Sequence, residues 1–456
     1  MKMKRLIYIA ILLITINEVK AQSSILNDYV KQGLESNLAL IQNQMTLESA
    51  EYALKAAKGM YLPSVSTQVR YSLAKGGRTI DFPIGDLLNP VYSTLNDMLE
   101  SQGGTAQFPM VENEQINFLR EQEFEAKISV KQPIYYPSIA INKRIEEQKL
   151  FMSEIELDQY KRELIFQIKE AYFNHMKALQ YFVLIQKTKE VVVENHRVTM
   201  KLLDNDMVTL DAVLRAKSEI SKVELYETEA LKNTELSKSY FNFLLNRDLN
   251  DEIIICSQPD VFKDPRIENL TENAINNREE LQLLEHQIMI MDRVADLSKA
   301  EMLPRLVLAL DYGLQGDELN IDSESDFIIG SFVLTWDLFS GNANRNRQKQ
   351  ALVQKKQVEY KKLEARNQIK LEVKQNIYEV EQNVKNLDLA KTRSSEAAEV
   401  YRIIEKRYRL GETQLIELLD AQNNMTEAES QVILSRYDYL VSMARLEKSS
   451  NTSLVL

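Results

Sequence analysis

The chain contains an internal duplication, and this feature constrains its fold more than any other. Residues 58–73 align with residues 299–314 at an offset of 241, with identical Lys, Leu, Pro, Tyr and Leu at matched positions. Further along, residues 128–134 align with residues 332–338 at an offset of 204. Two copies of one structural unit therefore account for most of the 456 residues.

The offsets between the copies also predict geometry. The fall from 241 to 204 places about 37 additional residues between Leu73 and Glu123, where Gly and Pro are concentrated. This stretch is predicted to be a long loop in the first copy, in which Val91, Leu95, Met98 and Leu99 are expected to form a short amphipathic helix. After the strands, Leu210 aligns with Leu415 at an offset of 205, so the two intervening helical segments have nearly equal length. Equal helical arms end in one plane.

Each copy contains two segments in which apolar and polar residues alternate, the pattern of a strand with two different faces. The predicted strands are residues 64–74, 123–136, 305–314 and 326–339. Strands of roughly ten residues suit a membrane β-barrel. An ordinary soluble sheet with one buried face has the same alternation, so the pattern alone leaves both structures open.

A barrel built from this chain must be shared between several chains, because the smallest membrane barrels need about eight strands and one chain supplies four. The polar faces of its strands are then expected to line the lumen. The predicted lumen residues are Gln68, Arg70, Glu125, Lys127, Lys131 and Asp311.

The helical part is predicted from two stretches of about seventy residues, Pro137 to Asp206 and Gly341 to Gly411, which contain no proline after the first residue. At 1.5 Å per residue, such a helix is about 100 Å long. Apolar residues recur in steps of three and four, as in Ile369, Val373 and Ile377, which predicts coiled-coil seams. Shorter helices return from each turn.

Composition excludes several classes of protein. The formal net charge of −11 disfavours a nucleic-acid partner. After residue 16 no apolar run reaches the roughly 20 residues of a transmembrane helix, which excludes a helical transporter. Cys256 is the only cysteine, so a disulfide within the chain is excluded. Because no catalytic, phosphate-binding or metal-ligand motif is found, we expect no enzyme activity, cofactor or metal.

The N-terminus has the pattern of a secretory signal peptide. Residues 1–5 carry positive charge, residues 6–16 are apolar, and Ala21 supplies a small residue at the cleavage position. The mature chain is therefore expected to be exported. The residue directly after the cleavage position is Gln22 and not a cysteine, so lipid attachment at that position is not expected.

Signal peptide, duplicated strand pairs and equal long hairpins together resemble the TolC-like outer membrane efflux proteins. The most specific stretches are Lys-Gly-Met-Tyr-Leu-Pro at residues 58–63 and the second hairpin tip with its continuation, residues 408–421. The resemblance implies a mainly α fold with a membrane β-barrel. In a homotrimer, twelve strands would close a barrel in outer-membrane lipid, and the helices would extend it as a tunnel into the periplasm. The implied function is export of small molecules or proteins as the exit duct of a tripartite efflux or type I secretion system.

The resemblance also implies two partners and several site residues. The partners are a periplasmic adaptor (membrane fusion) protein and an inner-membrane efflux transporter. Glu417 and Asp420 match the acidic pair of the family gate, and Tyr408 matches its gate tyrosine. Thr413 and Ala212 depart from the family pattern, where an arginine and an aspartate stand. The implied adaptor-docking residues are Asp206, Met207, Val208, Leu410, Gly411, Glu412 and Thr413.

The sequence therefore predicts the following organisation. The signal peptide is residues 1–21, and the first repeat is residues 22–246, with an outer loop at 75–122 and a hairpin tip at 205–208. A mid-rod segment follows at 247–266. The second repeat is residues 267–450, with a hairpin tip at 410–413, and the C-terminal tail is 451–456. Two alternatives are an exported soluble coiled-coil scaffold and a periplasmic adaptor. An adaptor has one hairpin flanked by Gly-rich β domains, whereas this chain has two hairpins and 12 glycines.

Overall fold

The computed structural model of the protein describes residues 25–255, 269–317 and 325–452. The predicted signal peptide (1–21), Cys256, most of the mid-rod segment and most of the tail lie outside these residues. The chain divides into two compact units. The strand unit comprises Lys55–Arg144 and Val294–Lys349, and the helical unit comprises the other described residues.

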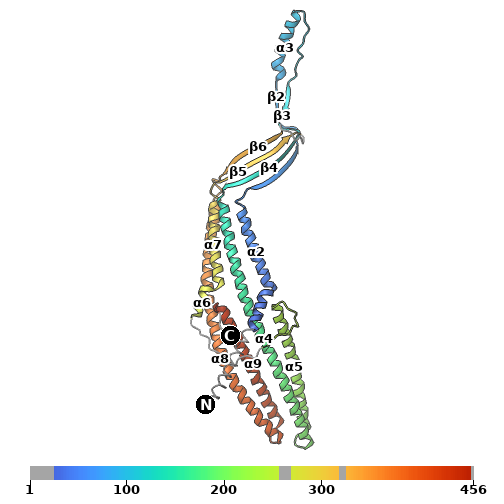
Figure 1. Ribbon diagram of the computed structural model, residues 1–456, viewed down its shortest axis with the longest axis vertical. Helices are drawn as coiled ribbons and strands as arrows, with labels where there is room; N and C mark the ends of the chain where they lie inside the picture. Colours follow the sequence, from blue (N-terminus) through green and yellow to red (C-terminus); the bar gives the residue numbers. More distant parts are fainter. Residues whose placement is uncertain (1–24, 256–268, 318–324, 453–456) are drawn as a thin grey trace, which may run out of the picture. The chain divides into compact units, whose positions relative to one another are not determined.

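Long helical hairpins dominate the helical unit (Figure 1). The helices are residues 25–36, α2 (Leu38–Gly59), α4 (Pro137–Asp204), α5 (Leu210–Leu244), α6 (Leu270–Asn277), α7 (Glu279–Ala300), α8 (Ala343–Arg409) and α9 (Leu415–Ser450). The two long helices, α4 and α8, have 68 and 67 residues, and their returning helices, α5 and α9, have 35 and 36. The two copies thus form arms of nearly equal length.

Buried apolar seams hold the helices together, as the spacing in the sequence predicts. On α8, Ile369, Val373 and Val380 are buried against Met443 and Leu446 of α9. Side chains three and four residues apart lie on one face of a helix, so these positions form a continuous ridge.

In each copy, the shorter helix of the hairpin ends beside a break in a second pair of helices, and the two breaks are at equivalent positions. The helix before α2 breaks at Asn37, whose Nδ2 donates to Leu244 O at the end of α5 (2.9 Å). In the second copy, α6 and α7 are separated at Arg278, and Asn451 Nδ2 at the end of α9 donates to Asn277 O (2.7 Å). Asn37 and Arg278 differ by 241, the same offset found in the sequence.

The strand unit contains one antiparallel sheet in the order β1-β4-β5-β6 (Figure 1). The strands are β1 (Ser64–Leu73), β4 (Gln122–Tyr135), β5 (Arg305–Gly316) and β6 (Asp326–Thr335). Ser64 pairs with Lys131 in the first hairpin, and Arg305 pairs with Thr335 in the second. These pairs are equivalent under the offsets of 241 and 204, so both hairpins have one register. The predicted α-plus-strand fold with internal duplication is confirmed.

The predicted outer loop is an ordered arm, which we define as residues 74–121. It contains a two-stranded ribbon, β2 (Thr79–Phe82) paired with β3 (Glu114–Asn117), and the helix α3 (Ile84–Ser101). The two strands of four residues were not predicted, because two alternations give too little pattern to separate a strand from a loop. Across the described residues, no helix is both long and apolar enough to cross a membrane.

Candidate functional site

The two hairpin tips have the same backbone turn. At the first tip, Asp206 has φ 55°, and the backbone N–H of Met207 donates to Leu202 O (2.8 Å). At the second tip, Gly411 has φ 76°, and the N–H of Glu412 donates to Arg407 O (2.9 Å). This bond closes a helix C-terminus around one left-handed residue. Aspartate takes the place of glycine at the first tip because it tolerates this conformation.

The tips contact each other through Met207 and Gly411. A Cβ atom added at Gly411 would clash with Met207 Cε, so the second turn approaches the first closely. Met207, Leu410 and Glu412 are exposed, and Val208 and Thr413 are partly exposed. The helical unit therefore presents both tips together as one surface with exposed apolar side chains.

The predicted acidic pair lies on one exposed face of α9. Glu417 and Asp420 are both exposed, while Leu418 and Leu419 between them are buried in the seam. Thr413 Oγ1 donates to Glu417 Oε2, and Asn424 Nδ2 donates to Asp420 Oδ2 (3.3 Å). The pair thus stays accessible and three residues apart, so that several copies of α9 would stack rings of negative charge.

The third predicted gate residue, Tyr408, does not join this acidic face. Its side chain is only 1% exposed, and its hydroxyl lies 2.9 Å from Thr199 Oγ1 of α4. Burial raises the pKa of the Tyr408 phenol, and the hydrogen bond with Thr199 opposes this rise. Tyr408 therefore fastens α8 to α4 inside one chain.

Sequence reasoning missed a buried polar network next to Tyr408. Asn195 Nδ2 of α4 donates to Gln422 Oε1 of α9 (2.9 Å) and to the Tyr401 hydroxyl of α8 (3.3 Å). All three side chains are buried. The available signal was a polar residue at an apolar position, since Asn195 stands three residues after the core residue Val192. Such networks fix which helices pair, because an unpaired buried amide is costly.

Buried His175 of α4 predicts a pH dependence of the helical unit. Its Nδ1 lies 3.1 Å from Ser237 Oγ of α5. Burial lowers the pKa of His175 below its usual 6.5, although the Thr234 backbone opposes this lowering. The unfolded chain therefore takes up a proton near pH 6.5, whereas the folded chain does so only at lower pH. This contribution to the free energy of unfolding is fully present above about pH 6.5, and it is lost as the pH falls through the lower pKa of the folded state.

We expect the melting temperature to decrease between about pH 7.5 and pH 5, and His175→Gln to reduce this decrease. Thermal unfolding followed by circular dichroism measures both. His196→Gln, on the same helix but outside the core, is the control that should retain the wild-type pH dependence. An equal slope in His175→Gln and wild type would contradict the assignment.

The sheet has one polar and one apolar face. The predicted lumen residues Gln68, Arg70, Glu125, Lys127, Lys131 and Asp311 occupy strand positions that share the polar face. There Glu125 accepts from Lys127 Nζ (2.9 Å) and pairs with Arg70 (2.7 Å). Asp311 Oδ1 is buried without a hydrogen-bond partner. A charged cluster of this kind requires a polar environment on its face of the sheet.

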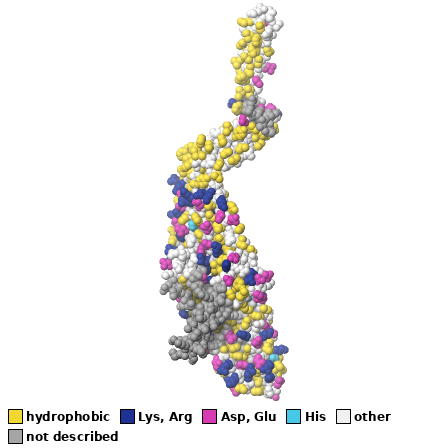
Figure 2. All heavy atoms as spheres, in the orientation of Figure 1, with side chains coloured by type: hydrophobic (Ala, Val, Ile, Leu, Met, Phe, Trp, Pro, Cys, Tyr) yellow, Lys and Arg dark blue, Asp and Glu magenta, His cyan; other side chains and the backbone are white. Residues whose placement is uncertain are grey.

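The apolar face of the sheet is exposed in the single chain. Its residues include Val69 of β1, Ile128 of β4, Tyr312 of β5, and Ile328 and Phe332 of β6. Ile328 is 70% exposed and Phe332 is 75% exposed. Figure 2 shows hydrophobic atoms across the visible face of the sheet. A contiguous apolar surface of this extent marks a membrane or protein contact.

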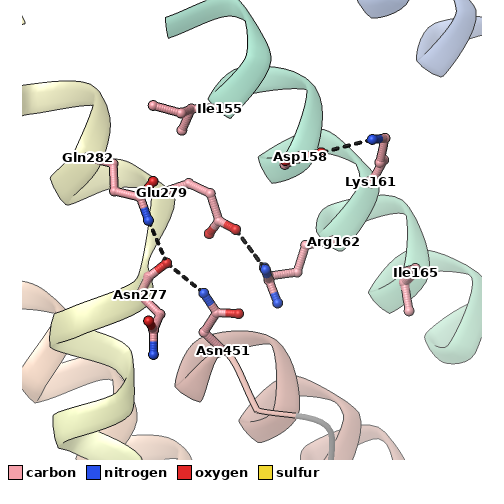
Figure 3. A pocket seen from close by; sticks show the side chains of 9 residues that line it. All are labelled: Ile155, Asp158, Lys161, Arg162, Ile165, Asn277, Glu279, Gln282 and Asn451. Atoms are coloured by element: carbon pink, nitrogen blue, oxygen red, sulfur yellow. Dashed lines mark hydrogen bonds and ion pairs between the residues drawn. The ribbon is translucent and has the colours of Figure 1, made fainter. Parts of the chain in front are cut away.

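A cavity of about 430 Å³ lies beside the joint at Arg278 in the helical unit (Figure 3). Gln282 Nε2 and Asn451 Nδ2 both donate to Asn277 O (3.1 and 2.7 Å), and Arg162 donates to Glu279 Oε1 (2.7 Å). These hydrogen bonds connect α4 with α7, and they connect Asn277 of α6 with both α7 and the end of α9. Within the described part of the chain, no three His, Cys, Asp or Glu side chains are placed to hold a metal ion.

Comparisons with known proteins connect this geometry to a family. Residues 270–452 match the family model of the outer membrane efflux proteins. The resemblance read from the sequence is thus confirmed. No curated protein matches the chain in a sequence search.

Solved structures share the fold over nearly the whole chain. A membrane protein from Pseudomonas aeruginosa is 15% identical, with a TM-score of 0.76 over 93% of this chain and 92% of its own. The outer-membrane channel OprN is 16% identical, with a TM-score of 0.75 and coverage of 94% and 90%. The Campylobacter jejuni CmeC outer membrane channel is 16% identical, with a TM-score of 0.75 and coverage of 93% and 85%.

Proposed function

We propose that the chain is one subunit of a trimeric outer membrane channel that serves as the exit duct of an efflux or type I secretion system. One observation carries this proposal: a four-stranded sheet exposes a complete apolar face while charged residues gather on its other face. This arrangement suits a barrel wall between lipid and water. The family match of residues 270–452 and the shared fold support it.

Assembly into a ring follows from the unpaired edges of the sheet. Among the described strands, β1 and β6 each have a neighbour on one side only. Four strands are too few to close a barrel, and exposed edges promote pairing with another chain. Three copies joined from β1 of one to β6 of the next give a twelve-stranded barrel.

The helical unit also has two lateral edges that suit a ring. Helix α4 packs against α5 through Ile185, Val192 and Val223. On its other side, α4 contacts α9 and also α8, and α8 packs against α9. Figure 1 shows α5 and α8 on opposite sides of the helical unit, so these two helices form the lateral edges of each subunit in the proposed ring.

Helix α8 carries an exposed apolar line along this edge. The line consists of Val353, Tyr360, Leu371, Tyr378, Leu389 and Val400. Steps of seven and eleven residues return to nearly the same direction on a helix, so these side chains share one side. In the proposed trimer this line packs against the next subunit.

The base of the sheet has residues suited to a membrane interface. Trp336 donates its indole N–H to Met302 O (3.0 Å) and remains half-exposed. Tyr61, Tyr135 and Phe339 are also exposed near the ends of their strands. Aromatic belts of this kind lie at membrane boundaries. In the proposed channel, this end of the sheet lies at the membrane boundary that faces the periplasm.

Adaptor docking at the tips predicts a specific defect in Gly411→Val. A β-branched residue at φ 76° costs about 1–2 kcal/mol and also collides with Met207. We expect loss of efflux, measured as increased sensitivity of cells to exported compounds, with the trimer retained. Gly59→Val is the control, since Gly59 has open space for a side chain and no positive φ. Unchanged efflux in assembled Gly411→Val trimers would contradict docking at the tips.

Fractionation and conductance test the proposed function directly. We expect the full chain in the outer-membrane detergent extract, as a trimer that forms discrete channels in planar bilayers. A monomer in the soluble periplasm would instead identify a coiled-coil scaffold. A protein that binds an inner-membrane pump but forms no channel would identify an adaptor.

A further inference from the structure

The arm, residues 74–121, has an exposed apolar stripe along its helix. The stripe consists of Leu87, Val91, Leu95 and Met98 of α3. Intervals of four, four and three residues keep these side chains on one side of the helix. Figure 2 shows hydrophobic side chains along one side of the arm.

The ribbon at the base of the arm adds a second apolar surface. Ile80 pairs with Ile116 across β2 and β3, and both are exposed together with Phe82 and Phe118. Residues of one parity in paired strands share a face. Both the helix and the ribbon of the arm therefore present apolar surface in the single chain.

Hydrogen bonds make the arm a defined structure. Asn89 Nδ2 donates to Val111 O (2.9 Å), and the Val111 N–H donates back to Asn89 Oδ1 (2.8 Å). Two turns later, Asn96 repeats this reciprocal pairing with Phe108 (2.8 and 3.1 Å). The asparagine side of α3 is thus occupied by the returning chain, and the apolar stripe points to another side.

The charges of the arm disfavour a lipid surface as the occupant of this stripe. Helix α3 contains Asp86, Asp97 and Glu100 but no lysine or arginine. Helices that lie on membranes carry basic residues beside their apolar face, because lipid surfaces are commonly anionic. An acidic helix with an apolar stripe is better suited to pack against another helix of the same kind, with its acidic side in water.

We propose that the occupant is a second copy of this chain: in the trimer, the three α3 stripes pack together and form a cap over the external mouth of the channel. This inference rests on the proposed function. The arm leaves the sheet at β1, where the Ala74 N–H donates to Glu121 O (3.0 Å). Since β1 is the edge strand that the next copy must complete, the ring brings three arms to the same end of the barrel. Their apolar side chains then fill one shared core.

Cysteine crosslinking of the full-length protein in outer membranes tests this packing. In a Cys256→Ser background, Val91→Cys and Met98→Cys place a thiol in the stripe. Ser93→Cys and Glu100→Cys place one on the polar side of the same helix, as matched controls. On mild oxidation we expect a shift from monomer to disulfide-linked dimer on denaturing gels for the two stripe variants only.

A conductance measurement provides the second readout. Replacing residues 79–118 by a short Gly-Ser linker should leave the trimer intact and increase its single-channel conductance. Stripe cysteines that react with maleimide but do not crosslink, in a protein that still forms trimeric channels, would overturn the cap while the proposed function stands. Crosslinks to another protein would also overturn it. Absence of any trimer would contradict both proposals.

Discussion

Replacing Glu417 and Asp420 together by alanine should reduce cation selectivity and block by multivalent cations in planar bilayers. Both carboxylates are exposed on one face of α9, beside the hairpin tip. In a trimer they give six negative charges in a narrow passage, where low-dielectric walls focus the field. Oxygen-lined rings bind hard multivalent cations. We expect a roughly tenfold loss in affinity for the blocking cation.

A second pair of glutamates on α8 provides a control variant that removes the same number of charges at another position. Glu396 and Glu399 have the same spacing and are both exposed, and Glu399 already pairs with Arg402 (2.6 Å). Their double alanine variant should retain selectivity and block. If the Glu417 and Asp420 variant behaves in the same way as this control, the acidic pair is a solvated helix face and the gate lies elsewhere.

Arginine at position 328 should prevent assembly in the outer membrane, whereas arginine at position 329 should be tolerated. Ile328 is the third of the ten residues of β6; it lies on the apolar face and pairs with Tyr312. A lipid-facing arginine costs about 2–4 kcal/mol at the bilayer centre and less towards either interface. Ile329 lies on the opposite face and pairs with Asp311, whose Oδ1 is buried without a partner. An arginine at position 329 can form an ion pair with the Asp311 carboxylate on this face.

Yield of heat-resistant trimer in outer-membrane extracts measures this difference. The two variants introduce the same side chain at adjacent positions, so each is the control for the other. Equal loss in both would indicate a sheet buried on two sides. Equal tolerance would place the apolar face in water and contradict the barrel.

The different results expected at positions 328 and 329 show how much the sequence predicts about the sheet. Alternation in β6 assigns Ile328 and Ile329 to opposite faces, although they are the same type of residue, because a strand has a period of two. The repeat offsets of 241 and 204 also imply that the two hairpins are equivalent, and the structure gives both the same register. The arm was predicted only as a loop with a short helix, because its ribbon strands are too short for a periodic signal.

The candidate site also has features that the sequence predicts and features that it does not. The left-handed turn at Asp206 was predictable, since the equivalent residue is Gly411. The exposure of Glu417 and Asp420 follows from helical spacing. The burial of Tyr408 against Thr199 did not follow, because the spacing of one helix gives its faces but not the helix that each face meets.

The sequence by itself determined the duplicated unit, the strand faces and the equal hairpin arms, because periodicity and repeat offsets are local properties of the chain. Only the tertiary structure decided that α4 contacts both α8 and α9, through the buried amides of Asn195 and Gln422 and the hydroxyls of Thr199 and Tyr408. These residues are far apart in the chain. Their partners are selected by the cost of leaving a buried polar group unpaired, which depends on all of the packed helices at once.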